Sequence, residues 1–154
     1  MIRLLPPGVF KMFKQILLPL DISEGEDTGK AIRAAVDLAV ANQSQLHILT
    51  VMPGFGSPIV ASYFPQQDMN KALEAVYSQL RKLVEPFIPD NLEVKLRAVE
   101  GKPYKQILKE AKRVHADLIV IPSHSPKAVE RFFLGSTAAR VVERAEVSVM
   151  VIRD

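Results

Sequence analysis

Apolar residues recur along this chain with two different spacings, and segments of the two kinds alternate from Met12 onward. Short apolar runs with few charges predict β-strands, and segments whose apolar residues recur every three or four positions predict amphipathic helices. The pattern predicts strands over residues 15–20, 46–52, 92–99, 118–121 and 147–152. It predicts helices over residues 24–42, 70–85, 103–114 and 136–145.

The order of these elements predicts the fold class. Strands and helices alternate throughout, which is typical of an α/β fold with a doubly wound five-stranded parallel sheet, flanked by helices and joined by right-handed crossovers. The run 118–121 is apolar throughout and predicts a central strand covered on both faces. Residues 92–99 alternate apolar and charged side chains and predict an edge strand. A ligand is expected beyond the carboxyl ends of the strands, where the strand order reverses.

Two segments do not follow the pattern. Residues 1–11 contain Pro6-Pro7-Gly8 and have no clear periodicity, so we interpret them as a disordered or loosely docked extension of a domain spanning 12–154. They are too short and too interrupted for a secretory signal. The second segment, 53–68, is a long connection that contains Tyr63 and Phe64. Such a loop either covers a ligand or partner site or lies on the surface, and the sequence leaves both interpretations open.

Composition narrows the classes of protein that the chain can belong to. At 154 residues it is long enough for one domain with a real core, and no apolar stretch approaches the ~20 residues that span a membrane. The net charge is +3, and no basic run is interleaved with aromatic residues, so nucleic-acid binding is not expected. The chain has no cysteine, which excludes disulfides and thiolate chemistry and suits a reducing cytoplasm.

The strongest chemical signal follows the strand 118–121. That strand leads into Pro122-Ser123-His124-Ser125-Pro126, and Gly135-Ser136-Thr137 then opens the last helix. A helix N-terminus has unpaired N–H groups and the positive end of the helix dipole, so it attracts phosphate. Gly135 allows close approach of the backbone, and Ser136 and Thr137 add hydroxyl donors. The alternative is that Ser136 only caps the helix after a loop that Gly135 ends.

A carboxylate is expected on the other side of the same crevice. Asp21 ends the first strand, and it faces the loop at Gly135 if the first and fourth strands are neighbours. There it can accept hydrogen bonds from ribose hydroxyls or from the adenine amino group. It can equally form a turn by accepting bonds from nearby backbone N–H groups, and the spacing does not separate the two roles.

Five short motifs in order resemble the universal stress protein family over the chain from Met12 to Asp154. They are Ile16-Leu17-Leu18-Pro19-Leu20-Asp21, Gly101-Lys102-Pro103 with Ile107, Ala116-Asp117-Leu118-Ile119-Val120-Ile121, Leu134-Gly135-Ser136 and the closing strand 147–152. The resemblance implies a Rossmann-like fold of the adenine-nucleotide-binding type, with ATP or AMP as ligand and Mg²⁺ accompanying ATP. It implies contacts to adenosine from Pro19, Asp21 and Val51, and contacts at or beside the phosphates from Pro122, Ser125, Gly135, Ser136 and Thr137. Ser123 and His124, in the same loop, are further candidates for contact with the nucleotide.

The glycine motif departs from the family pattern G-x2-G-x9-G-[S/T]. Gly135 and Ser136 match its last pair, but Pro122 and Ser125 occupy the two earlier glycine positions. Proline removes one backbone donor, and both residues add bulk where the backbone should approach phosphate. Hydroxyls of Ser123, Ser125 and Ser136 can replace the lost donors, as in a branch of the family with fewer glycines. A closed, nucleotide-free pocket is the alternative.

Catalysis is not expected to be the main role of this site. His124 is the only histidine of the chain near it, and no second residue completes a nucleophile–base pair. No cluster of carboxylates indicates a dedicated metal site. The sequence therefore favours a nucleotide-binding stress-response regulator. A nucleotide-free interaction module, and a slow ATPase or self-phosphorylating protein with Ser136 as acceptor, are the alternatives.

The closing strand predicts self-association. Residues 147–152 are apolar on both faces, and an apolar edge strand invites pairing with another chain. We expect a symmetric homodimer through antiparallel pairing of two such strands, which the family resemblance also implies, and two dimers would make a tetramer. The alternative is that residues 1–11 fold back over an edge of the sheet.

Overall fold

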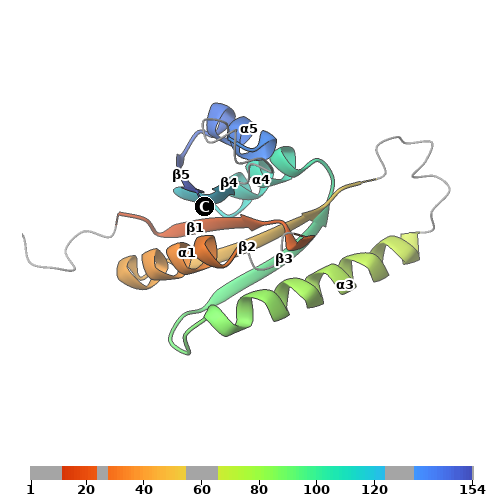
Figure 1. The fold of residues 1–154 in the computed structure, drawn as a ribbon, viewed down its shortest axis with the longest axis horizontal. Coiled ribbons are helices and arrows are strands. Elements are labelled where there is room, and N and C mark those ends of the chain that lie inside the picture. The colour runs from red at the N-terminus through yellow and green to blue at the C-terminus, as the bar shows by residue number, and fades with distance from the viewer. Residues whose placement is uncertain (1–11, 24–27, 55–65, 124–133, 154) are drawn as a thin grey trace, which may run out of the picture.

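The centre of the molecule is a five-stranded sheet in the order β3-β2-β1-β4-β5, and every neighbouring pair is parallel (Figure 1). A computed structural model describes residues 12–23, 28–54, 66–123 and 134–153. Its strands are β1 (Gln15–Leu20), β2 (Gln45–Met52), β3 (Val94–Glu100), β4 (Leu118–Ser123) and β5 (Ser148–Arg153). Its helices are α1 (Gly29–Asn42), α3 (Gln66–Val84), α4 (Pro103–Arg113) and α5 (Ser136–Arg144), and a 3₁₀ turn, η2 (Glu85–Phe87), follows α3.

Helices cover both faces of the sheet. In Figure 1, α1 and α3 lie on one side of it, and α4 and α5 lie on the other. Successive side chains of a strand point to opposite faces, so β1 contributes to two cores. Ile16 and Leu18 pack in the core with α1, whereas Leu17 packs in the core with α4 and α5. The doubly wound parallel fold predicted from the sequence is confirmed.

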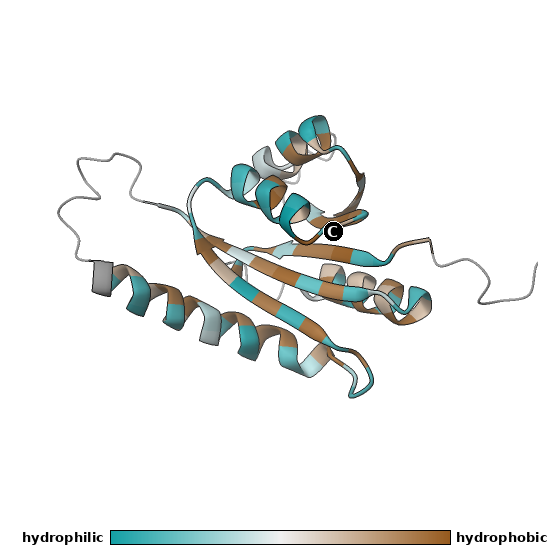
Figure 2. Cartoon of the chain, turned by 180° about the vertical axis from the view of Figure 1, so that it is seen from behind, coloured by the Kyte–Doolittle hydropathy of each residue, from teal (hydrophilic) through white to brown (hydrophobic). Residues whose placement is uncertain are grey.

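Positions in the sheet agree with the hydrophobic pattern. β4 lies between β1 and β5, and its residues Leu118 to Ile121 are buried. β3 and β5 are the two edges, and half-buried positions alternate with exposed ones along much of each. The long helix α3 is amphipathic, and bands of apolar and polar residues follow one another along it (Figure 2). No helix within the described ranges is long and apolar enough to span a bilayer.

Several predicted boundaries were wrong by a few residues. α1 begins at Gly29 rather than at residue 24, and residues 24–27 lie outside the described part of the chain. α3 begins at Gln66, so Asp68 lies in its first turn, where a carboxylate is favoured by the helix dipole, and not in the preceding connection. Residues 1–11, Tyr63 and Phe64 also lie outside the described residues.

Strand β4 is longer than its apolar pattern predicted. It continues through Pro122 and Ser123, which pair with Ile152 and Arg153 of β5. The prediction that Pro122 follows the strand was therefore wrong. Proline can remain in a strand where it has no ladder bond to donate. Here the paired register of β4 with β1 ends at Ile119, so the end of β4 has a paired neighbour on one side only.

Candidate functional site

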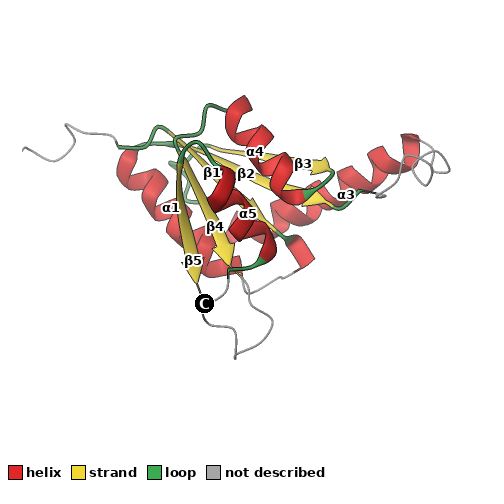
Figure 3. Cartoon of the chain, turned by 90° about the horizontal axis from the view of Figure 1, so that it is seen from above, coloured by secondary structure: helices red, strands yellow, loops and turns green. Residues whose placement is uncertain are grey.

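The neighbouring strands β1 and β4 separate toward their carboxyl ends. β1 pairs with β4 only at Ile16–Leu118 and Leu17–Ile119, whereas β4 pairs with β5 along its whole length. The sheet is also strongly twisted, and β4 and β5 run in a different direction from β2 and β3 (Figure 3). This is the point where the strand order reverses, which is where ligands bind in open α/β sheets.

A cavity of about 280 Å³ lies at this position. Its volume is at the small end of the ~300–1,000 Å³ typical of small-molecule sites. The ends of β1, β2 and β4 and the first turns of α4 and α5 contribute its lining. The structure thus brings together segments that are more than 100 residues apart in the chain.

Seven of the ten site residues predicted from the sequence line this cavity: Pro19, Asp21, Val51, Pro122, Gly135, Ser136 and Thr137. Ser123 is buried at the end of β4 and is not among the lining residues. His124 and Ser125 lie outside the described residues. Asp21, Gly135 and Ser136, which the sequence was expected to bring to one crevice, line the same cavity.

Most of the apolar walls of the cavity were not predicted from the sequence. Side chains on the α4–α5 face of the sheet and on α4 itself form much of its surface. Two signals were available: Leu49 and Ile121 lie on the same face as Leu17 by strand alternation, and Pro103 begins a helix at the carboxyl end of β3. The additional lining residues are Leu20, Leu49, Pro53, Pro103, Ile107, Ile121 and Ala138.

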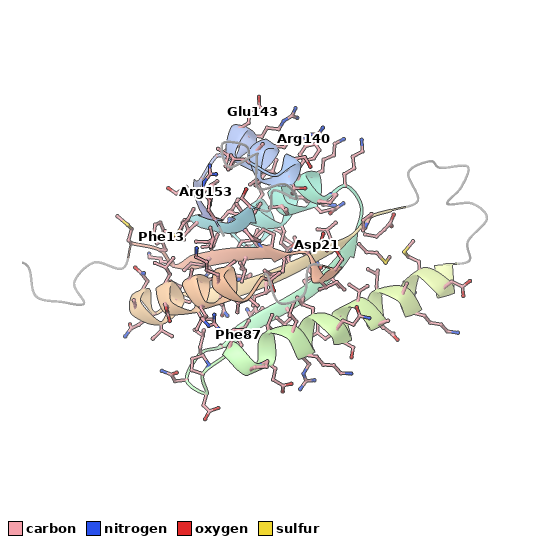
Figure 4. The ribbon with its side chains drawn as sticks, viewed as in Figure 1. Phe13, Asp21, Phe87, Arg140, Glu143 and Arg153 are labelled. Carbon is pink, nitrogen blue, oxygen red and sulfur yellow. The ribbon has the colours of Figure 1, made fainter. Side chains whose placement is uncertain are left out.

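Asp21 takes the turn-forming role, one of the two that the sequence left open, and it also lines the cavity. Its Oδ1 accepts hydrogen bonds from the Ser23 backbone N–H at 2.9 Å and from Ser23 Oγ at 2.6 Å, which makes a local turn directly after β1. The residue is exposed at the end of β1 (Figure 4), and it lines the cavity. The turn holds the carboxylate through Oδ1, and these two bonds leave Oδ2 for a ligand.

The first turn of α5 supplies a second polar part of the cavity lining, besides Asp21. Gly135 is the N-cap, and its carbonyl accepts the Ala139 N–H at 2.9 Å. No side chain caps this helix, and its first turn contains no acidic residue. The backbone donors of Ser136 and Thr137 therefore have no intrahelical partner, and the first turn itself carries no carboxylate that could accept from them. This arrangement suits an anion.

The first turn of α4 reaches the same cavity through a glycine turn. Gly101 has φ of 139°, a conformation that side chains with a Cβ rarely adopt, and its N–H donates to the Met52 carbonyl at 2.9 Å. Pro103 then occupies the first turn of the helix, where its missing N–H costs nothing. Gly101 thereby directs the start of α4, with Pro103 and Ile107, against the ends of β1 and β2.

The strongest charge network of the described residues is at the far end of α4. Glu110, whose side chain is only 7% exposed, accepts hydrogen bonds from Arg97 at 2.9 Å and from Arg113 at 2.6 Å. Burial alone would raise the pKa of Glu110, but the hydrogen bond from Arg113 and the charges of Arg97 and Arg113 lower it on balance. The neighbouring His47 has a lowered pKa because of burial and the charge of Lys95. This network stabilises α4 on the sheet and does not line the cavity.

Fold and cavity together define a doubly wound α/β protein with a small anion-compatible site at its switch point. Comparison with known proteins identifies its family. The model of the Universal stress protein family matches residues 12–153. Universal stress protein G of Shigella flexneri is 30% identical over 148 residues, which cover 92% of this chain and 100% of that protein. The chain therefore belongs to the universal stress protein family.

Solved structures show the same fold. Protein MJ0577 of Methanocaldococcus jannaschii superposes with a TM-score of 0.71 at 23% identity, covering 93% of this chain and 97% of that one. A universal stress protein in complex with cAMP has a TM-score of 0.64 at 21% identity, with coverages of 92% and 97%. The universal stress protein of Archaeoglobus fulgidus in complex with dAMP has a TM-score of 0.58 at 22% identity, with coverages of 92% and 98%.

Proposed function

We propose that this protein is a stress-response regulator that binds an adenine nucleotide in the cavity at the carboxyl ends of β1 and β4. The observation that carries the proposal is that Asp21 and the uncapped N-terminus of α5 line one cavity at the switch point. Membership of the universal stress protein family supports it, as do the cAMP and dAMP complexes of proteins with the same fold.

The chemistry of the cavity suggests how a nucleotide is oriented. Apolar walls from Leu49, Val51 and Ile107 suit a flat base, and the Asp21 carboxylate suits the hydroxyls of a ribose. The backbone donors of Ser136 and Thr137, reinforced by the helix dipole, suit a phosphate. AMP and ATP share all of these groups, and ATP would bring Mg²⁺ with it. The bound nucleotide acts by changing the dimer surface or the loop after β2.

A nucleotide-free interaction module of the same fold is the second candidate. Pro122 lines the cavity at the position of the family's first glycine, and it has neither a backbone donor nor the small size of glycine. Among the described residues, the backbone N–H groups that a phosphate needs would then have to come from the first turn of α5. The slow ATPase or self-phosphorylating protein has less support, because the cavity lining contains no nucleophile–base pair within the described residues.

Partner binding by β5 is part of the proposal. β5 is an edge strand, and Met150 on it is 36% exposed while Val142 on the adjoining α5 is 42% exposed. An edge strand with exposed apolar side chains is favourable for antiparallel pairing with a second copy. The regulator is therefore proposed to be a homodimer through β5, and light scattering of wild type against Met150→Lys tests this.

The proposed function is tested by identifying small molecules released from the purified, denatured protein by mass spectrometry. Calorimetric titration with AMP and with ATP plus Mg²⁺ then follows. Co-purified adenine nucleotide, or micromolar-range binding in calorimetry, is the expected result. An empty protein that shows no binding heat at several temperatures would reject nucleotide binding and favour the interaction module.

A further inference from the structure

One hydrogen bond joins the last residue of β4 to the residue that begins α5. The Gly135 backbone N–H donates to Ser123 Oγ at 3.2 Å. Ser123 is only 6% exposed, and its side chain belongs to the buried end of the strand rather than to the cavity lining. Gly135, Ser136 and Thr137, by contrast, line the cavity. The bond therefore connects the interior of the sheet to the wall that would receive a phosphate.

This bond uses one of the backbone N–H donors at the start of α5 and leaves the next ones for a ligand. Gly135 N–H points to β4 and is already satisfied by the Ser123 hydroxyl. The N–H groups of Ser136 and Thr137 are the next donors of the first turn, and an anion in the cavity can accept from them. Donor–acceptor distances of useful hydrogen bonds fall within about half an ångström, from ~2.7 to ~3.2 Å. A small displacement of the first turn would therefore weaken phosphate binding.

We propose that Ser123 is a positioning residue for phosphate, and that its hydroxyl holds the N-terminus of α5 at the distance from β4 that phosphate binding requires. This inference rests on the proposed function and extends it to a residue that does not line the site. It differs from the expectation, drawn from the sequence, that the Ser123 hydroxyl donates to phosphate directly. The adenosine part of the ligand, which faces Asp21 and the apolar walls, does not depend on this bond.

The test compares AMP with adenosine, because only AMP carries the phosphate. Wild type, Ser123→Ala and Ser123→Thr are titrated with both ligands by calorimetry. Ser123→Ala is expected to weaken AMP binding about threefold to tenfold, which is the equilibrium equivalent of one net hydrogen bond, and to leave adenosine binding unchanged. Ser123→Thr keeps the accepting oxygen and is expected to retain most of the AMP affinity.

Ser44→Ala is the matched control. Ser44 is also 6% exposed, and its Oγ donates to the Phe13 carbonyl at 2.7 Å at the opposite end of the sheet. Losing this bond should lower the free energy of unfolding without changing the ratio of AMP to adenosine affinity. A loss of affinity caused only by a weakened fold would appear in both serine variants and for both ligands.

Amide hydrogen exchange of the ligand-free protein separates positioning from direct contact. If Ser123 positions α5, Ser123→Ala accelerates exchange of the Gly135 amide about threefold to tenfold before any ligand is added. Unchanged AMP affinity, equal losses for AMP and adenosine, or an unchanged Gly135 exchange rate would each overturn the inference. If wild type binds neither ligand, the proposed function fails and this inference fails with it. If wild type binds AMP and only the Ser123 results disagree, the proposed function stands.

Discussion

Asp117 ties the start of β4 to Gln15 at the start of β1. The Gln15 N–H donates to Asp117 Oδ1 at 3.1 Å, and the Asp117 N–H donates to the Gln15 carbonyl at 3.0 Å. Asp117 Oδ2 also accepts the Lys14 N–H at 2.8 Å. The same two strands separate at their carboxyl ends, where the cavity lies. The Asp117 carboxylate therefore joins β1 and β4 at their starts, and the candidate site lies at the other end, where the two strands separate.

Asp117→Ala should destabilise the protein by about 1–3 kcal/mol, because two backbone donors lose a charged acceptor. Asp117→Asn should destabilise the protein less, since its amide oxygen still accepts one of the two hydrogen bonds. Urea denaturation measures both. Asp90→Ala is the control, since Asp90 is exposed in the turn before β3 and should change stability little. Equal stability of the Asp117→Ala and Asp90→Ala proteins would show that the link contributes nothing.

Gly135→Asp should affect binding and stability in opposite directions. An aspartate at the N-cap can accept hydrogen bonds from the free N–H groups of α5. The free energy of unfolding should therefore stay the same or rise by up to about 1 kcal/mol. The same carboxylate would repel a phosphate and compete for its donors, so AMP binding should be lost. Calorimetry and thermal unfolding measure the two effects.

Gly135→Asn adds a cap without a charge and is the control for that variant. It should bind AMP better than Gly135→Asp does. AMP affinity that survives Gly135→Asp would place the phosphate elsewhere.

Gly101→Ala should lower the free energy of unfolding by about 1–3 kcal/mol, because alanine is strained at φ of 139°. Its Cβ would also lie 2.7 Å from Gln106 Nε2. Gly54→Ala is the comparison, because there the new Cβ meets only the flexible end of the Glu100 side chain and no positive φ is involved. Urea denaturation should find Gly101→Ala the less stable of the two, and Gln106→Ala should not rescue it. Rescue by Gln106→Ala would mean that the steric contact, not the backbone, causes the loss.

Mild acid should destabilise the protein through His47. Burial, with the charge of Lys95, lowers the pKa of His47 below its ordinary 6.5. As the pH falls from about 7.5 to about 5.5, the unfolded chain takes up a proton at this residue before the folded protein does. The free energy of unfolding should therefore be fully retained above pH 6.5 and should fall as the pH drops toward the folded-state pKa.

His47→Gln isolates this effect. Glutamine does not titrate, and it can still bond to Gln15, whose Oε1 lies 2.7 Å from His47 Nε2. Urea denaturation at about pH 7.5, 6.5 and 5.5 should show a shallower pH dependence in the variant. Glu110 does not contribute in this window, since its pKa lies below the ordinary 4.5 and both states are ionised. Identical pH dependence in the two proteins would contradict the assignment to His47.

The parts of the site that could be predicted are those with a local signal. Asp21 follows a short apolar strand and Gly135 precedes a helix, so both could be placed at element ends from spacing alone. The end of β4 could not be placed, because Pro122 breaks the apolar pattern while pairing in register with Ile152. Pro103 and Ile107 were recognised as part of a helix start, but their position in the cavity wall depends on where that helix packs.

The sequence by itself determined the succession of strands and helices, the parallel doubly wound sheet and the element ends at which a ligand site would form. These properties follow from hydrophobic periodicity and from turn and helix-start chemistry, which act over a few neighbouring residues. Only the tertiary structure decided that Ser123 accepts from Gly135 and that Asp117 holds Gln15. Those bonds join residues 12 and 102 positions apart, and no local pattern records such contacts, because they exist only once packing has brought the strand and helix ends together.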